Sequence, residues 1–188
     1  MKRSIITILL CGFVFACFGQ KVTDSIPQNK STYLFFDFSQ GVVVGDINGF
    51  GYGLSGNYQN NKDLFSIRTN YIFEFSDIWA TLFQNKEGTS INEYALLYGK
   101  RFVFNDSSLS ISIGISSNLW KYDAKENDTK VVKRKSYIGL PIEITGLGFD
   151  KKAEKMGILI GAKLFSNIGK ASYVGIAINF SIGKHKRH

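Results

Sequence analysis

Acid–base chemistry in this sequence would have to come from carboxylates. The two histidines, His185 and His188, lie in the last four residues, beyond the final predicted strand. A Ser-His-carboxylate triad needs the histidine base within hydrogen-bond reach of the nucleophile, so such a triad is excluded. Glu74 and Glu93 could in principle share a proton for general acid–base work. Structural pairing of these two carboxylates with Arg68 and Arg101 is the interpretation we favour.

The charged residues that could act together fall on one face of the predicted strands. They are Asp37, Arg68, Glu74, Glu93, Arg101, Glu143 and Lys163. Charges enclosed in a narrow interior must pair, because an isolated buried charge is very costly. We therefore expect an interior network of salt bridges that fills the lumen of a barrel. A gated ion path along the same charges is the alternative.

No cofactor is expected from the motifs. Gly51 to Gly56 match the GxGxxG pattern, but dinucleotide binding needs a strand, a turn and a helix around that pattern, and no helix is predicted. No cluster of His, Cys, Asp and Glu has metal-ligand spacing. Cys11 and Cys17 both fall within the first 19 residues, which we expect to be removed.

Alternation of apolar and small polar residues predicts the elements that carry these charges. Between Ser107 and Trp120 every second residue is Leu or Ile over most of the segment, with Ser, Gly and Asn between them. Tyr173 to Ile182 repeats the pattern. Eight such segments of roughly ten residues, 19 glycines and 14% aromatic residues indicate an all-β fold, an eight-stranded antiparallel up-and-down transmembrane β-barrel.

The apolar faces are expected to point outward into lipid. Eight strands enclose an interior just wide enough for side chains, so the small and charged residues fit inside and the bulky ones do not. A barrel closes on itself and satisfies every backbone group that hydrocarbon cannot. Aromatic residues gather near both strand ends, for example Phe73 and Phe75 at one end and Phe65 and Phe102 at the other, as in interfacial girdles.

The predicted connections alternate in length. Gln59 to Asp63 and Asn105 to Ser108 are tight turns, whereas Ser76 to Ser90 and Lys121 to Lys135 are long polar loops. Outer-membrane barrels have short periplasmic turns and long extracellular loops, so we place the long loops outside. Pro141 removes one ladder donor and suggests a bulge in its strand.

The N-terminus is typical of a secretory signal. Lys2 and Arg3 precede an apolar run that ends at Phe18, and the expected cleavage lies between Gly19 and Gln20. Processing as a lipoprotein at Cys17 is the alternative. The domain organisation is then a signal peptide at 1–19, a polar leader at 20–31, the barrel at 32–184 and a basic tail at 185–188. The chain is basic, with a net charge of +8, but its secretion signal predicts export. We therefore exclude nucleic-acid binding as its function.

Taken together, the signal segment, the eight alternating strands and the final amphipathic strand Tyr173 to Ile182 resemble the small OmpA/OmpX-type outer-membrane barrels. The resemblance covers the whole mature chain. It implies a fold and a place in the outer membrane but no particular chemistry, because one fold hosts many functions.

Several functions are compatible with this fold. The first is a non-enzymatic structural or interaction role, with the long loops as the contact surface. The alternatives are a small gated pore, an enzyme that modifies outer-leaflet lipid through Glu74 or Glu93, and a periplasmic ligand carrier. The expected partners are outer-membrane lipid and lipopolysaccharide, with a protein partner on either side of the membrane as a further possibility.

Overall fold

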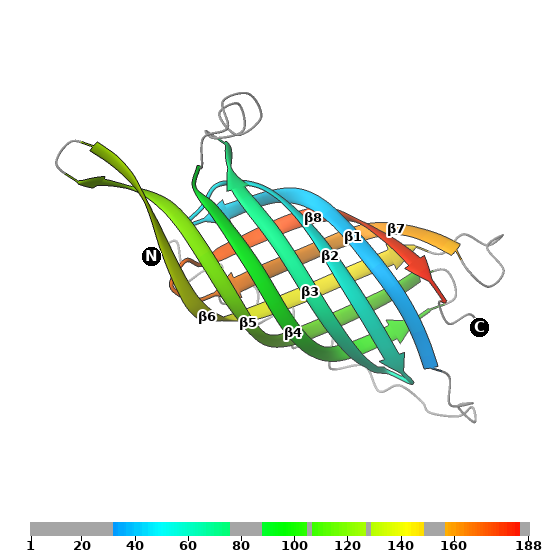
Figure 1. Ribbon diagram of the computed structural model, residues 1–188. Helices are drawn as coiled ribbons and strands as arrows, with labels where there is room; N and C mark the ends of the chain where they lie inside the picture. Colours follow the sequence, from blue (N-terminus) through cyan, green and yellow to red (C-terminus); the bar gives the residue numbers. More distant parts are fainter. Residues whose placement is uncertain (1–31, 76–87, 105–106, 127–128, 149–156, 185–188) are drawn as a thin grey trace, which may run out of the picture.

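Eight antiparallel strands form a closed barrel in the computed structural model (Figure 1). The structure describes residues 32–75, 88–104, 107–126, 129–148 and 157–184. The predicted signal peptide, leader and basic tail lie outside these residues. In chain order the strands are β1 Thr32–Gly45, β2 Gly49–Asn60, β3 Asp63–Glu74, β4 Ser90–Val103, β5 Ser107–Glu126, β6 Thr129–Gly148, β7 Gly157–Ile168 and β8 Tyr173–Gly183. Among the described residues, no helix is long and apolar enough to cross a membrane.

Each strand pairs with its neighbours in sequence, and β1 pairs with β8 to close the sheet. Closure removes the open edges that would otherwise leave a row of unpaired backbone groups. The predicted fold class is therefore confirmed. We call one rim the hairpin end, because it carries the β1–β2, β3–β4, β5–β6 and β7–β8 connections. The other rim, where β1 begins and β8 ends, is the termini end.

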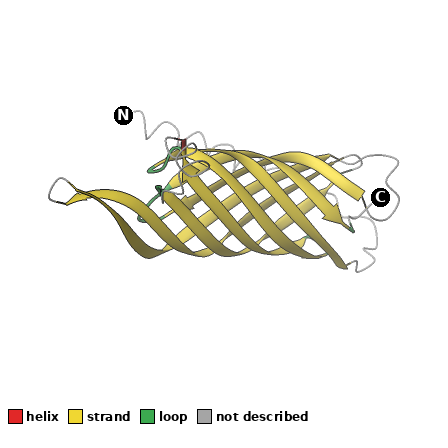
Figure 2. Ribbon diagram, turned by 45° about the horizontal axis from the view of Figure 1, so that its top comes forward, coloured by secondary structure: helices red, strands yellow, loops and turns green. Residues whose placement is uncertain are grey.

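The β5–β6 hairpin projects well beyond the hairpin end (Figures 1 and 2). Its two strands have 20 residues each, and the pairing of β4 with β5 reaches only as far as Lys121. The five residues of β5 beyond Lys121 therefore extend roughly 17 Å past β4 at a rise of about 3.4 Å per residue. They pair only with β6.

This hairpin corrects the prediction of a long polar loop from Lys121 to Lys135. The strands continue through that segment up to Glu126 and resume at Thr129, in register. Val131 and Val132 explain the difference, because β-branched residues favour an extended backbone even where charged neighbours hide the alternation.

The predicted bulge at Pro141 is also wrong. The pairing of β5 with β6 keeps the same register on both sides of Pro141, from Ile113 opposite Ile142 to Ser116 opposite Gly139. Pro141 itself stays opposite Asn167 of β7. The missing N–H is therefore accommodated by an interrupted ladder and not by an extra residue.

Side chains alternate between the two faces of the wall along most of each strand. Along β8, Tyr173, Ala177 and Asn179 are buried, whereas Ile176 and Ile178 between them are exposed by 54% and 58%. The exposed face carries large apolar residues on all eight strands. The apolar side chains are thus mostly outside the barrel, and the polar ones are mostly inside.

Candidate functional site

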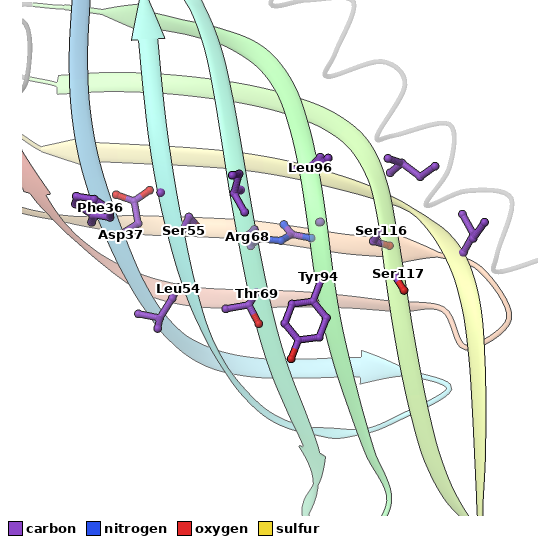
Figure 3. A pocket seen from close by; sticks show the side chains of 15 residues that line it. Phe36, Asp37, Leu54, Ser55, Arg68, Thr69, Tyr94, Leu96, Ser116 and Ser117 are labelled. Carbon is purple, nitrogen blue, oxygen red and sulfur yellow. The ribbon is translucent and has the colours of Figure 1, made fainter.

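The lumen is the candidate functional site, because the charged residues of the strands converge there. Figure 3 shows part of the wall, where Asp37, Ser55 and Arg68 come from the same strands as their neighbours Phe36, Leu54 and Thr69. Asp37, Ser55 and Arg68 are at most 5% exposed, whereas Leu54 is 55% exposed. The period of two along each strand puts neighbouring residues on opposite faces of the wall.

Arg68 of β3 is the cation that links two buried carboxylates in the lumen. Its guanidinium donates from Nε and Nη2 to Glu93 Oε1, at 2.9 and 2.5 Å, and from Nη1 to Glu143 Oε2 at 2.8 Å. Arg68 is 1% exposed and Glu93 is fully buried. A rigid fork of donors suits this arrangement, since it can bind two carboxylates from different strands, Glu93 of β4 and Glu143 of β6, at once.

Glu93 of β4 is the most heavily bonded carboxylate. Besides Arg68 it accepts hydrogen bonds from Asn70 Nδ2 at 3.2 Å, from Asn167 Nδ2 at 2.6 Å and from the Tyr173 hydroxyl. These partners come from β3, β7 and β8, so one carboxylate joins strands across the whole lumen. Glu93 thereby links its own strand to three others through its two carboxylate oxygens.

Lys163 of β7 extends the network from Glu143 of β6 to Ser55 of β2. Its Nζ lies 3.4 Å from Glu143 Oε1 and 3.4 Å from Ser55 Oγ. Thr145 Oγ1 donates to the same carboxylate oxygen at 3.2 Å. Glu143 therefore joins two of the buried cations, Arg68 and Lys163, and its charge is compensated on both sides.

Asp37 and Arg101 are the other two buried charges of the interior. Asp37 of β1 accepts a hydrogen bond from Asn57 Nδ2 at 2.8 Å. Arg101 of β4 lies near the termini end, where it donates to Gln59 Oε1 at 3.1 Å and stacks on the Phe35 ring with its central carbon 4.5 Å from the ring centroid. Interior charge thus occurs in more than one layer along the barrel axis.

Glu74, the seventh predicted member, does not join the other six. It lies half-buried at the end of β3, and among the described residues it makes no ion pair. Asn70 is the residue opposite Glu93, so Glu74 is four residues further along, roughly 13 Å at the rise of a β-strand. At this distance Glu74 and Glu93 cannot share a proton. Without Glu74, the buried interior holds three acids and three bases.

Sequence reasoning missed an apolar cap that lies between the charge network and the hairpin end. Its members are Val43, Ile47, Ile72, Ile91, Phe165, Ala171, Tyr173 and Ala177. Trp120 and Tyr137 pack against it. A signal was available, since Ile72 and Ile91 have the same parity along their strands as Arg68 and Glu93. The cap matters because bulky side chains exclude water from the lumen at this level.

Among the residues that the structure describes, no three His, Cys, Asp or Glu side chains are grouped so that they could hold a metal ion. The buried carboxylates are engaged instead by arginine, lysine and amide donors.

These features define a class of protein, the closed eight-stranded antiparallel barrel with an apolar exterior and a polar, side-chain-filled interior. No protein-family model matches the sequence, and no curated protein matches it. Solved structures do match the fold. The chain has the fold of the small eight-stranded outer-membrane β-barrels.

Two of these structures define the likeness. One is Neisserial surface protein A (NspA), with a TM-score of 0.51 and 11% identity over 82% of this chain and 99% of that one. The other is the N-terminal β-barrel domain of Pseudomonas aeruginosa OprF, with a TM-score of 0.50 and 12% identity over 80% of this chain and 99% of the domain. At such low identity the likeness is one of fold and not of chemistry.

Proposed function

We propose that this protein is an integral outer-membrane barrel with a structural or interaction role, a lumen closed by its own side chains and the β5–β6 hairpin as its contact surface. The observation that carries the proposal is the sidedness of the wall. Ile67, Ile138 and Ile158 are between 65% and 74% exposed, and similar residues surround the barrel. Soluble monomers rarely expose contiguous apolar patches above a few hundred Å², whereas acyl chains solvate such a surface.

The hairpin end is the extracellular side in this proposal. The termini end carries the two-residue β2–β3 turn, with Asn61 in the left-handed region at φ 56°, and short turns are typical of the periplasmic side. The projecting hairpin then reaches past the lipid surface. It is the part of the described chain best placed to meet another molecule outside the cell.

We propose a closed lumen in preference to a gated pore. An open path would need a continuous polar channel, but the apolar cap and the Arg68–Glu93 pair occupy successive levels of the interior. An enzymatic role through Glu93 is disfavoured, because its carboxylate is filled by structural donors.

Gel mobility tests the proposal directly. The full chain is expressed in a Gram-negative host, the outer-membrane fraction is isolated, and samples are run in dodecyl sulfate with and without boiling. A folded barrel resists the detergent, so we expect the unboiled band to migrate differently from the boiled band. Identical mobility, or recovery of the protein in the soluble fraction, would contradict the proposal.

A further inference from the structure

Gln40 of β1 places an exposed carboxamide on the outward apolar face of the barrel. The other residues of that face from Leu34 to Val44 are large and apolar, and they are 41% to 60% exposed: Leu34, Phe36, Phe38, Val42 and Val44. The residues paired with Gln40 on the two neighbouring strands are Tyr52 and Ile178, which are 46% and 58% exposed. Gln40 is therefore surrounded by side chains that suit lipid.

The position of Gln40 along β1 puts it near the middle of the hydrocarbon layer. Leu34 lies six residues towards the termini end and Val44 four residues towards the hairpin end. At a rise of about 3.4 Å per residue and a strand tilt of roughly 45°, these residues lie roughly 14 Å and 10 Å from Gln40 along the membrane normal. The apolar band of an outer-membrane barrel is about 25 Å tall, so both headgroup layers are far from the Gln40 amide.

Within the part of the chain that the structure describes, the Gln40 carboxamide has no hydrogen-bond partner. The outward hydroxyls of Thr69 and Ser117 differ from it, because serine and threonine hydroxyls can bond to nearby backbone carbonyls. An amide without a partner in hydrocarbon is costly. Lipid headgroups and water do not reach this depth, so the missing donor and acceptor have to come from another protein chain.

A second copy of this chain supplies both groups. A carboxamide carries an acceptor oxygen and a donor NH2 side by side, so two carboxamides that face each other form two N–H···O bonds. In a two-fold symmetric contact, a residue on the axis meets the same residue of the other copy. Gln40 placed on such an axis therefore satisfies its own counterpart.

The tilt of the strands favours a contact at a single level. Strands of outer-membrane barrels tilt by about 35–45°, so two copies of β1 that face each other across an axis along the membrane normal cross at about twice that angle. Neighbouring strands in an eight-stranded ring point roughly 45° apart, so Ile178 of β8 turns away from the contact and stays open to acyl chains. The amide pair is then the main specific interaction.

Electrostatic repulsion does not oppose this approach. Over their described lengths, β8, β1 and β2 carry no charged residue on the outward face. β5 lies four strands from β1 in the closed ring (Figure 1), on the opposite side of the barrel. The projecting β5–β6 hairpin is therefore free for other contacts when two barrels meet at β1.

We propose that two copies of this barrel associate in the membrane through β1, with the Gln40 carboxamides paired across a two-fold axis. This inference rests on the proposed membrane location of the barrel. It is independent of which end of the barrel is extracellular.

The test is sedimentation equilibrium of the full chain, folded in a density-matched non-ionic detergent and measured over a range of protein-to-detergent ratios. The variant is Q40L, which removes the carboxamide and keeps a side chain of similar size. T69V is the matched control, since it removes a half-buried polar group from the outward side of β3 and keeps the shape of the side chain. Folding of each protein is checked by heat-dependent gel mobility.

We expect the parent to form dimers and the dissociation constant of the dimer to rise roughly tenfold in Q40L, because two hydrogen bonds between membrane-embedded side chains are lost together. T69V should stay within about twofold of the parent. Q40L should keep its heat-dependent mobility, because Gln40 has no partner within its own barrel.

A monomeric parent, or a dissociation constant that is the same in Q40L and in the parent, would overturn this inference and leave the barrel proposal standing. Loss of heat-dependent mobility in Q40L alone would show that the amide is needed within its own barrel, and would also overturn the inference. A parent protein without heat-dependent mobility would overturn both proposals.

Discussion

Arg68→Met is the substitution that best measures what holds the lumen together. Arg68 is 1% exposed and neutralises two buried carboxylates through three hydrogen bonds of 2.9, 2.5 and 2.8 Å. Methionine is apolar and roughly similar in length, so it leaves Glu93 without a cationic partner and the interior with one excess negative charge. Breaking a buried pair in this way costs about 3–5 kcal/mol, most of it from the uncompensated charge.

A double-mutant cycle separates this cause from a loss of packing. Glu93→Gln alone removes a charge but keeps an oxygen that can accept from Asn167 and Tyr173. In Arg68→Met/Glu93→Gln the interior is balanced again, so we expect the double variant to be more stable than the sum of the single losses by about 2 kcal/mol, within the range measured for residues in contact.

The assay is equilibrium unfolding in urea of protein reconstituted in lipid vesicles, followed by tryptophan fluorescence and by gel mobility. Lys100→Gln is the matched control, because Lys100 pairs with Asp63 at 3.0 Å on the outer surface, where the two side chains are 54% and 40% exposed. No measurable change is expected there. Two results would refute the argument that charge pairing stabilises the interior. One is strict additivity of the changes in unfolding free energy in the cycle, and the other is a decrease from Arg68→Met no larger than that from Lys100→Gln.

Three further predictions follow from the wall and the lumen. Ile178→Arg places a charge in the middle of the outward face of β8, where Ile178 is 58% exposed, and should lower the free energy of unfolding by about 2–4 kcal/mol. Val132→Arg on the projecting hairpin should have little effect. Similar losses of unfolding free energy for the two variants in urea titrations would contradict the lipid-facing assignment. Gly139→Val should destabilise the barrel, because a Cβ at this position would lie 2.0 Å from Asn167 Oδ1. The Asn167 side chain, which donates a hydrogen bond to Glu93, would have to move. An unfolding midpoint in urea equal to that of the parent would show that the lumen is packed more loosely than described. In planar bilayers the parent should not conduct, and Phe165→Ala/Tyr173→Ala, which opens the apolar cap, should raise the current; steady current through the parent would favour the pore.

The fold was predictable because the alternation of side chains carries most of the information about a transmembrane barrel. In β5, Leu and Ile alternate with Ser, Gly and Asn through Leu119, and only a strand with unlike faces uses such a sequence. The division of the charged residues between the two faces followed from the same parity. Asp37, Arg68 and Lys163 are all buried, as their parity indicates.

Contacts between strands were not predictable, because they depend on register. The alternation assigns Glu93 and Glu74 to the same face but cannot say that Asn167 and Tyr173 reach Glu93 while Glu74 lies at the rim. The length of the hairpin was missed for a different reason. From Lys121 onward the hairpin lies beyond the outward apolar surface of the barrel, and both of its faces carry charged residues. The alternation of apolar and polar residues that marks the strands therefore disappears, although the backbone pairing continues.

Quenching by brominated acyl chains tests the sidedness of the wall most directly. In a background without Trp79 and Trp120, a single tryptophan is placed at Ile178 on the outward face or at Val131 on the projecting hairpin, and the protein is reconstituted in vesicles of brominated phosphatidylcholine. We predict strong quenching at position 178, because that side chain lies among the acyl chains, and little at position 131. Weak and equal quenching at both positions would contradict a lipid-facing barrel.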